Sequence, residues 1–588
     1  MQPGDFAMKK MSLFLILMLA ILCITSCGTV EKDINPDSIT LNSIAGLNEQ
    51  IVLNLAKPTA GEYTVSYKAV NAKEYAVLDK ELILDNGETL DCYILGLAKG
   101  LYTVKIEIGE EDTYARKVVT DIDVEKQDRS GYAHFQREEG VGGYNNDGTI
   151  KDGAVILYVN NENKNTVTLD IKGTTYTGLV HVLQALEYME EPVIIRITDK
   201  ITTNQWSSKK VEPRLADDSN LTDDFFENTF STQYGENLAN LPTNLYDRRE
   251  GKVYQYITTP DGIEYTGSME DGYVRTVEFD GDVVYADDIN SNYFWITGAN
   301  NVTIEGVGPN AEFFQFGMLF DQSNSIEIKN LTFSKYPEDA LCFRASVSLC
   351  GPTEFGNYWI HHNTFNGGSI TWDLARSRGK GDGSTDFDNV TNYTIAYNKY
   401  KLCSKAILMG ATETSCGMCV TLHHNYFYEC VQRVPYAMNG NVHSYNNFYT
   451  GNNGSVSVRG NGYYFGEANH YTNKKSIEIL ENAGGAAIKS YGDWFENRNP
   501  PRDVTTVSDR EEYVPNGCMP DGVTDYSRFD TDPALFYYDA ENKCSDVDVM
   551  LPVTEVREFV RTYAGAGIYL KLDIPYTVPA TENESTAN

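Results

Sequence analysis

Two carboxylates stand four residues apart around a glycine, in the segment Asp382-Gly383-Ser384-Thr385-Asp386. A glycine lets the chain turn, so both side chains can present oxygen atoms to one hard cation, and Ca²⁺ prefers oxygen ligands of this kind. An Asp-Gly pair by itself is most often only a turn. Asp382 and Asp386 are therefore candidate calcium ligands whose role depends on what surrounds them.

Basic residues follow this segment at two points. Lys405 begins an apolar run that ends at Gly410, and Arg433 lies just before the next predicted strand. The chain carries 48 Lys and Arg against 83 Asp and Glu, a net charge of −35 that repels nucleic acid and anionic lipid headgroups. Between Arg376 and Lys405, however, six basic residues stand against three acidic ones. This stretch could face an anionic polymer, although isolated basic side chains are usually only solvated.

The elements that must position these residues are strands of an internal repeat. Five segments have the pattern of a strand that ends in an asparagine, at Asn330, Asn363, Asn398, Asn425 and Asn447. The intervals of 33, 35, 27 and 22 residues are typical of solenoid coils with loops of variable length. In stacked parallel coils, each asparagine could hydrogen-bond its neighbours, as in the ladders of cross-β structures. We therefore assign the asparagines a structural role.

From about residue 131 to residue 570 the chain resembles the pectate lyases of polysaccharide lyase family 1. The motifs in family order are Asp339-Ala340-Leu341, Tyr358-Trp359-Ile360-His361-His362, the DGxxD segment, the KxxLxG segment from Lys405, the RxP segment from Arg433 and Val442-His443-Ser444-Tyr445-Asn446-Asn447. The resemblance implies an all-β fold, a right-handed parallel β-helix.

The same resemblance implies a set of functional residues. By it, Asp339, Asp382 and Asp386 bind Ca²⁺, Lys405 binds the substrate and Arg433 is the catalytic base. The implied reaction is calcium-assisted β-elimination on polygalacturonate, the de-esterified form of pectin, which leaves 4,5-unsaturated oligogalacturonides.

Three positions depart from the family pattern. A second arginine, five residues after the base, is here Met438; a histidine before the lysine is Cys403; and an additional acid is Pro337. Two alternatives stay open: a pectin lyase acting on methyl-esterified polymer, and an inactive β-helix that only binds polysaccharide. The retained aspartates argue against the first alternative, because a neutral substrate needs no calcium.

Histidines recur next to the repeated asparagines, at His361, His362, His423, His424 and His443. Their side chains could serve acid-base catalysis or bind a metal ion. Buried polar side chains in folded proteins are usually satisfied by hydrogen bonds, and these positions lie beside the expected ladder. We therefore interpret the histidines as structural polar groups.

The N-terminus has the pattern of an export signal. Two lysines precede an apolar run from Met11 to about Ile24, which is short for a membrane span. The four residues that end at Cys27 resemble a bacterial lipobox, in which the cysteine is acylated and becomes the mature N-terminus. We expect a signal peptide over residues 1–27, a lipid anchor on Cys27 and an exported outer-membrane lipoprotein, on the cell surface or in the periplasm.

Residues after the signal show a period-two strand pattern broken by glycine turns, which is typical of a small sandwich of the immunoglobulin or fibronectin type. The predicted organisation is a tether (28–35), the sandwich (36–128), a β-helix lyase domain (131–575) and a disordered tail (576–588). We also expect an insertion over about 202–250 and a short helix over 556–561 that packs over the last coils. The protein is expected to be a monomer.

Of the 11 cysteines, Cys23 and Cys27 lie in the signal segment, and the rest are odd in number, so they cannot all pair. Cys416 and Cys419 have CxxC spacing, but no second pair of this kind accompanies them, which favours a loop disulfide or buried thiols over zinc. Two further cysteines, Cys403 and Cys430, lie just before Lys405 and Arg433. A disulfide between these two is a hypothesis that requires their coils to be adjacent.

Overall fold

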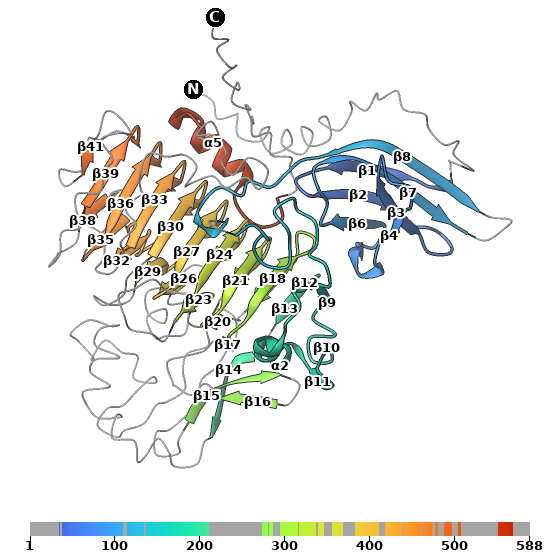
Figure 1. Ribbon diagram of the computed structural model, residues 1–588, viewed down its shortest axis with the longest axis horizontal. Coiled ribbons are helices and arrows are strands. Elements are labelled where there is room, and N and C mark those ends of the chain that lie inside the picture. Colours follow the sequence, from blue (N-terminus) through green and yellow to red (C-terminus); the bar gives the residue numbers. More distant parts are fainter. Residues whose placement is uncertain are drawn as a thin grey trace, which may run out of the picture. The chain divides into compact units, whose positions relative to one another are not determined.

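The computed structural model describes residues 35, 38–109, 114–134, 137–202, 204–210, 273–279, 282–285, 294–314, 317–334, 336, 339–345, 355–367, 383–410, 418–438, 440–454, 456–460, 462–472, 477–479, 487–496, 504–506 and 551–568. The chain divides into two compact units (Figure 1). The first comprises residues 1–127, 147–149 and 569–572, and the second comprises 128–146, 150–568 and 573–588. The predictions for residues 1–34 and 576–588 concern residues outside the described ranges.

The first unit contains two antiparallel sheets of four strands each. One has the order β1 (Leu41–Gly46), β2 (Gln50–Ala56), β6 (Thr89–Leu95), β5 (Ile83–Asp85), and the other β4 (Ala76–Val77), β3 (Thr64–Ala69), β7 (Gly100–Ile108), β8 (Ala115–Val124). In β2, Ile51, Leu53 and Leu55 are fully buried and alternate with partly exposed residues. This alternation places one face of the sheet in a core. The assignment to an immunoglobulin or fibronectin type stays a prediction.

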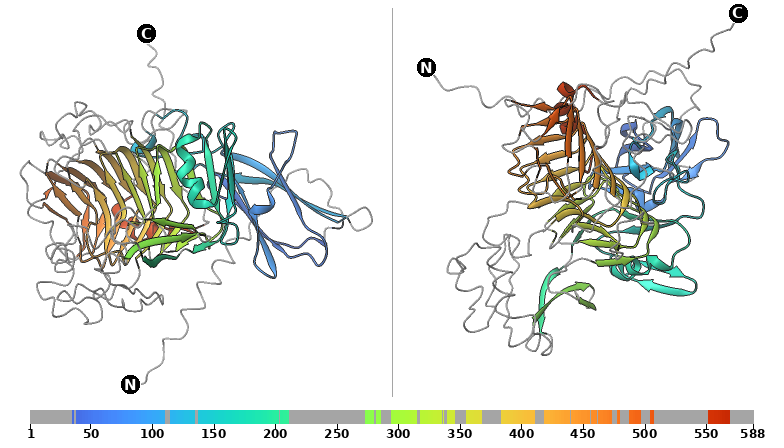
Figure 2. Two further views of the ribbon diagram at one scale, coloured as in Figure 1. Left: turned by 90° about the horizontal axis from the view of Figure 1, so that it is seen from below. Right: turned by 60° about the vertical axis from the view of Figure 1, so that its left-hand side comes forward.

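The second unit is a parallel β-helix, as predicted. The chain visits three parallel sheets in a fixed order, so that three successive strands make one coil (Figures 1 and 2). Sheet 1 contains β9 (Val155–Val159), β12 (Val193–Ile197), β18 (Asn300–Gly306), β21 (Asn324–Lys329), β24 (Gly356–His361), β27 (Thr391–Ala396), β30 (Met418–His423), β33 (Gly440–Tyr445), β36 (Tyr463–Glu467), β39 (Ala487–Tyr491) and β41 (Thr505–Thr506).

The other two sheets complete each coil. Sheet 2 contains β13 (Lys200–Thr202), β19 (Glu312–Phe314), β22 (Thr332–Ser334), β25 (Thr364–Asn366), β28 (Lys399–Lys401), β31 (Tyr426–Tyr428), β34 (Phe448–Thr450), β37 (His470–Tyr471) and β40 (Trp494–Phe495). Sheet 3 contains β17 (Phe294–Thr297), β20 (Met318–Asp321), β23 (Leu341–Arg344), β26 (Gly383–Asp388), β29 (Lys405–Met409), β32 (Tyr436–Met438), β35 (Val456–Arg459) and β38 (Ile477–Ile479).

The interior of the β-helix is filled by similar side chains stacked from coil to coil. On sheet 2, the ring centroids of Phe365 and Tyr400 lie 4.9 Å apart, those of Tyr400 and Phe427 5.0 Å, and those of Phe427 and Tyr449 4.7 Å. These distances follow from the spacing of hydrogen-bonded strands, about 4.8 Å, because side chains in register must stack at that interval. The buried rings supply much of the apolar surface that stabilises the coils.

The asparagine ladder forms at the corners between sheets 1 and 2. The Oδ1 atom of Asn398 accepts from the backbone N–H of Asn363 at 2.9 Å, and Asn425 accepts from Asn398 in the same way at 3.0 Å. The prediction for Asn330 is wrong by one residue, because Leu331 occupies the ladder position and donates its N–H to Asn363. Asn330 instead takes the left-handed corner conformation (φ 54°), which asparagine tolerates better than most residues.

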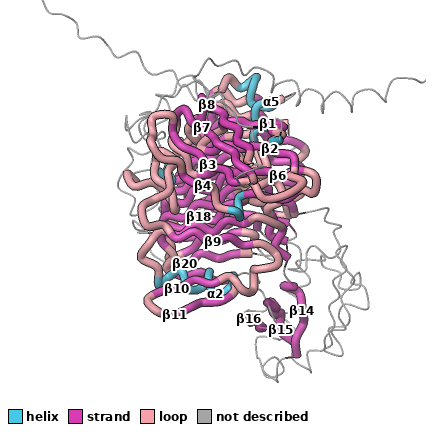
Figure 3. Tube along the Cα trace, turned by 90° about the vertical axis from the view of Figure 1, so that its right-hand side faces the viewer, coloured by secondary structure: helices cyan, strands magenta, loops and turns pink. Residues whose placement is uncertain are grey.

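Within the described part of the chain, two α-helices pack against the β-helix. Helix α2 (Leu179–Gln184) follows β10 (Thr168–Ile171) and β11 (Thr174–Thr177), beside which it lies in Figure 3, and buries its apolar side chains in the end of the core. Helix α5 (Val553–Tyr563) packs Val556 and Val560 against Phe448 on β34, which confirms the predicted C-terminal helix. Among the described residues, no helix has the length and apolarity needed to cross a membrane.

Residues 128–146, here called the strap, lie along the outer face of sheet 1. Backbone N–H groups of the strap donate to side chains of four coils: Gly142 to Ser325, Gly143 to Thr303, Ala133 to Thr394 and Tyr132 to Thr421, at 2.8 to 3.0 Å. The approach is close, because a Cβ atom on Gly131 (φ +107°) would lie 2.5 Å from Thr394 Oγ1. The strap therefore buries polar side chains that would otherwise face solvent.

The predicted insertion lies between β13 and β17. Between the same two strands, β14 (Asn204–Lys210), β15 (Tyr273–Phe279) and β16 (Asp282–Tyr285) form a separate antiparallel sheet, of which only β14 lies within the predicted bounds 202–250. Most of the range 202–250 lies outside the described residues, so that prediction is untested there.

Candidate active site

Four of the five predicted site residues belong to neighbouring strands of sheet 3. Asp339 precedes β23, Asp386 lies on β26, Lys405 begins β29 and Arg433 precedes β32. Adjacent strands lie about 4.8 Å apart, so these residues come from successive coils of the β-helix. The fifth predicted residue, Asp382, lies outside the described residues.

The carboxylates of Asp339 and Asp386 converge on Gly383. Asp339 Oδ1 accepts the backbone N–H of Gly383 at 2.6 Å. A Cβ atom on Gly383 would lie 2.2 Å from Asp386 Oδ1 and 2.7 Å from Asp339 Oδ1, so no side chain fits between them. The glycine thus lets carboxylate oxygens from two adjacent coils approach the backbone closely, which a side chain at this position would prevent. Anionic oxygen donors of this kind match the preference of Ca²⁺.

Arg433 reaches the Asp386 carboxylate from the coil beyond Lys405. Its Nη1 atom donates to Asp386 Oδ2 at 3.0 Å, and 24% of its side chain is exposed. The backbone of Arg433 has φ +53°, an uncommon conformation for a residue with a side chain, and its carbonyl accepts the N–H of Ile407. This corner conformation directs a partly exposed guanidinium into the site instead of continuing the strand.

Lys405 stands directly beside Gly383, because the two residues are partners in the register of β29 and β26. Its backbone also bridges to Gln432, next to Arg433. Cys342 is the register partner of Asp386. Burial, followed by the negative charges of Asp339 and Asp386, raises the pKa of its thiol, which indicates a negative electrostatic potential around the two carboxylates. The site therefore combines carboxylates with two cationic side chains.

Pairs of arginine and aromatic residues flank the site along sheet 3. On one side, the guanidinium of Arg344 lies 4.0 Å from the ring centroid of Trp295, and 40% of that tryptophan is exposed. On the other side, Arg459 Nη1 donates to Tyr436 Oη at 2.9 Å. Arg459 is the register partner of Met438, the position at which the family pattern has an arginine. Sequence reasoning missed these pairs, because coil register is not visible in the sequence.

Some predicted features do not gather at this site. Lys399 and Lys401, which belong to the basic stretch, lie on β28 of sheet 2. Trp359 and the histidines His361, His423 and His443 are buried on sheet 1, and the structural interpretation of the histidines stays a prediction.

The predicted disulfide between Cys403 and Cys430 is wrong. The two residues lie on adjacent coils, as Val431 N–H donates to the Cys403 carbonyl, but both thiols are free and buried. Each thiol contacts a carbonyl of the preceding coil instead, Cys403 that of Phe365 and Cys430 that of Tyr400. Cys419 is buried and Cys416 lies outside the described residues, so both alternatives for the CxxC segment stay predictions.

Comparison with known proteins gives a direct match for this part of the chain. Residues 287–513 match the family model described as pectate lyase. The chain resembles the pectate lyases of polysaccharide lyase family 1, in agreement with the motif order. The matched segment includes the strands of sheet 3 that carry Asp339, Asp386, Lys405 and Arg433.

Among curated proteins, pectate lyase 2 of Pectobacterium carotovorum is 30% identical over 223 residues, which are 36% of this chain and 54% of that protein. Pectate lyase C of Dickeya chrysanthemi is 27% identical over 213 residues, 34% of this chain and 53% of that protein. The chain thus spans about half the length of the curated relatives it matches.

Among solved structures, the match to a pectate lyase from Bacillus sp. N165 in complex with trigalacturonate includes 74% of this chain and 98% of that protein's chain. The sequence identity is 16% and the TM-score is 0.40. Pectate lyase II from Xanthomonas campestris covers 47% of this chain and 80% of its own, with 22% identity and a TM-score of 0.32.

Proposed function

We propose that this protein is a polysaccharide lyase, a pectate lyase that cleaves polygalacturonate by β-elimination. The observation that supports this most strongly is the convergence of Asp339 and Asp386 at Gly383, with Lys405 and Arg433 on the next coils. Carboxylates that bind a divalent cation, beside two basic side chains, suit a substrate that is itself a polyanion. The pectate lyase match over residues 287–513 supports the same reaction class.

The reaction requires removal of a proton next to a carboxylate. In polygalacturonate the C5 proton lies α to the C6 carboxylate, and its removal places more negative charge on a group that is already anionic. The C4–O bond then breaks, a C4=C5 double bond forms and the departing oxygen takes a proton. Cationic groups that face the developing charge lower the barrier to the first step. Lys405 is the proposed cation of this chain at that place, and Arg433 gains its positive charge only when it takes the proton.

Arg433 is the proposed base. A guanidinium normally stays protonated, and the Asp386 carboxylate at 3.0 Å stabilises its charged form. The residue must therefore lose a proton before it can accept one from C5, which alkaline pH favours. Lys405 binds the substrate carboxylate in this scheme.

Calcium fits the carboxylate pair. Asp339 and Asp386 would hold the ion, with Asp382 as the third expected ligand, because the absence of a side chain at Gly383 lets the two described carboxylates come close together. A bound Ca²⁺ would withdraw charge from the substrate carboxylate and make the neighbouring proton more acidic. The chain's own contribution is to hold anionic ligands from adjacent coils at one point.

The flanking pairs suit a chain of sugar acids. Arginine can bind a carboxylate through two parallel hydrogen bonds, and an aromatic ring offers an apolar face to a sugar ring. We assign Arg344 with Trp295 and Arg459 with Tyr436 to binding positions on either side of the reacting sugar. In this proposal Arg459 replaces the arginine that the family pattern has at the position of Met438.

One assay separates this proposal from its two alternatives. A pectate lyase forms unsaturated product from polygalacturonate, detected by ultraviolet absorbance, and loses activity when a chelator removes calcium. A pectin lyase would act on methyl-esterified polymer with the chelator present. An inactive binding protein would retain polygalacturonate on a column without forming product, and either of these two results would overturn the proposal.

We also infer that the protein is exported, attached to the outer membrane by lipid on Cys27, and monomeric. The short apolar run followed by the lipobox-like segment supports the anchor. A membrane-attached lyase would act on polymer outside the cytoplasm, where polygalacturonate is accessible.

A further inference from the structure

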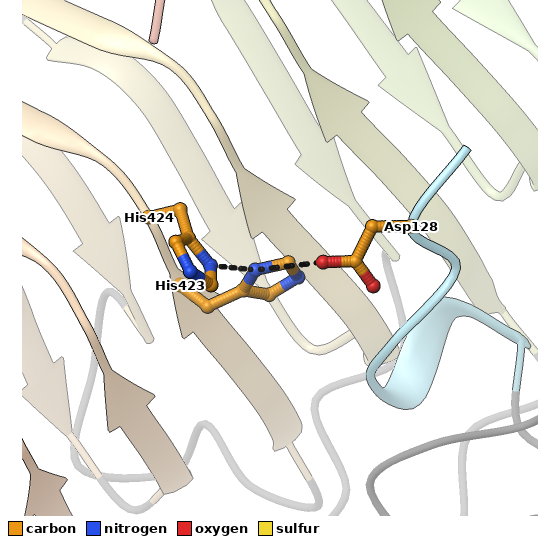
Figure 4. Close-up of side chains that lie close together, drawn as sticks. All are labelled: Asp128, His423 and His424. Carbon is orange, nitrogen blue, oxygen red and sulfur yellow. Dashed lines mark hydrogen bonds and ion pairs between the residues drawn. The ribbon is translucent and has the colours of Figure 1, made fainter. Parts of the chain in front are cut away.

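A cluster of one carboxylate and two imidazoles lies beneath the strap, on the outer face of sheet 1 and apart from sheet 3 (Figure 4). Asp128 begins the strap, His423 ends β30 and His424 follows at the corner. The exposed fractions of these residues are 2%, 0% and 1%. The proposed lyase chemistry uses none of them.

Ligand atoms of the three side chains converge. His423 Nδ1 lies 2.9 Å from His424 Nδ1 and 3.9 Å from Asp128 Oδ2, and all three ligand atoms lie within 4.8 Å of one another. An ion placed about 2.4 Å from each of these atoms would contact all three. Zinc bonds to nitrogen and oxygen are about 2.0 to 2.2 Å long, so the ligand atoms need to move by only a few tenths of an ångström to bind zinc. Among the described residues, this is the one group of three such side chains.

The backbone brings the two rings to the same side. Adjacent residues of an extended strand point to opposite faces, but His424 has φ 52°, which turns its ring towards that of His423. His361 and His362 repeat this geometry, with their Nδ1 atoms also 2.9 Å apart. Their acid, Glu327, contacts Nε2 of His361 instead, so no carboxylate joins the Nδ1 atoms there in a group of three.

The charge states suit a divalent ion. Burial lowers the pKa of His423 to about 4 and that of His424 to about 3, so both rings are neutral at neutral pH and can offer lone pairs. Burial acts to raise the pKa of Asp128, but the interactions with the two imidazoles and the hydrogen bonds from Ser130 and Tyr397 outweigh it, and the pKa is lowered. A neutral imidazole and an ionised carboxylate are the forms that bind a metal.

We propose that Asp128, His423 and His424 bind one zinc ion that fastens the strap to the β-helix. Two nitrogen donors and one oxygen favour zinc over Ca²⁺ or Mg²⁺, which prefer all-oxygen sites. Tyr397 Oη donates to Asp128 Oδ2 at 2.6 Å and Ser130 N–H donates to Oδ1 at 3.0 Å, so the carboxylate is already oriented. The ring that carries its hydrogen on Nδ1 moves it to Nε2, and a water molecule takes the fourth position.

Element-specific metal analysis tests the proposal on untagged, full-length protein refolded with zinc and calcium together. We expect about one zinc per chain after dialysis, separate from any calcium, and a higher melting temperature with zinc than without it. Cobalt in place of zinc should give the visible absorption bands of a four-coordinate site with nitrogen and oxygen ligands. Less than about one tenth of a zinc per chain, with no cobalt bands, would show a purely hydrogen-bonded cluster and overturn the proposal.

Matched variants locate the ion. Asp128→Asn and His424→Gln should reduce bound zinc at least tenfold, whereas His362→Gln, in the pair without a converging carboxylate, should leave it unchanged. Equal loss in His362→Gln would overturn the assignment. If the variants at Asp128 and His424 do not fold, the zinc content and cobalt spectrum of the wild-type protein still decide the question. Calcium-dependent product formation is measured in parallel, so failure of the proposed lyase function would be seen separately.

Discussion

At the scale of single residues, the candidate active site depends on two backbone features as much as on charged side chains. Gly383 lets the carboxylates of Asp339 and Asp386 approach its backbone closely, and Arg433, in the left-handed conformation, donates from its guanidinium to Asp386. Either feature can be lost without changing a charged residue. Substitutions at the charged residues themselves should therefore separate binding from catalysis.

Arg433→Lys keeps the positive charge but moves the accepting nitrogen and removes the planar fork. We expect kcat on polygalacturonate to fall by about 10²- to 10⁴-fold, the usual contribution of a positioned base, with KM nearly unchanged. Steady-state measurement of unsaturated product checks this. Arg561→Lys, on helix α5, serves as the control and should be neutral. Turnover near the wild-type value in Arg433→Lys would exclude this residue as the base.

Asp386→Asn removes one anionic oxygen from the calcium site. We expect weaker calcium binding, seen as a rightward shift of activity against calcium concentration by about tenfold or more, and partial recovery at high calcium. Asp388→Asn, two residues along the same strand, is the matched control, because Asp388 does not border Gly383. An unchanged calcium dependence in Asp386→Asn would contradict the assignment of this ligand.

At the scale of elements, the corner ladder ends on a carboxylate instead of an amide. Asp493 Oδ1 accepts from the N–H of Asn469 at 2.7 Å and from its Nδ2 at 3.0 Å, and Ser490 donates to Oδ2. Burial raises the pKa of Asp493 to about 7, and these hydrogen bonds only partly oppose it. The last coils therefore contain an acid that is protonated in the folded protein at moderately acidic pH.

The pH dependence of stability follows from that shift. Because the pKa of Asp493 is higher in the folded than in the unfolded state, its contribution is fully present below about pH 4 and is lost as the pH rises through about 7. The loss is at most about 4 kcal/mol, less for a side chain that is partly exposed. Asp493→Asn, which extends the amide ladder, should flatten the fall in melting temperature from pH 5 to 9. An equally steep fall in the variant would contradict this account.

At the scale of the whole molecule, the proposed anchor determines where the lyase acts. Cys27→Ala should release the protein from the membrane fraction into the soluble fraction, because an acyl chain is its only expected attachment. Cys23→Ala, within the same apolar segment, is the control and should remain attached. Fractionation followed by immunoblotting measures both variants, and full membrane retention of Cys27→Ala would refute the lipoprotein proposal.

The sequence by itself determined the solenoid, the structural role of the asparagines and the candidate residues Asp339, Asp386, Lys405 and Arg433, because strand patterns and motif order are local. It placed the ladder one residue too early, at Asn330 instead of Leu331. Which residue of a corner joins the ladder depends on the register with the neighbouring coil. It also predicted a disulfide where two thiols instead contact carbonyls of the preceding coils.

Only the tertiary structure decided which residues share a coil face. It placed Arg459 beside Met438 and brought Asp128 under the strap to His423 and His424, residues far away in the sequence. Loops between strands vary in length, so register from coil to coil is set by stacking in the core and not by spacing along the chain. For that reason the candidate substrate-binding pairs and the proposed zinc site could not be found from motifs alone.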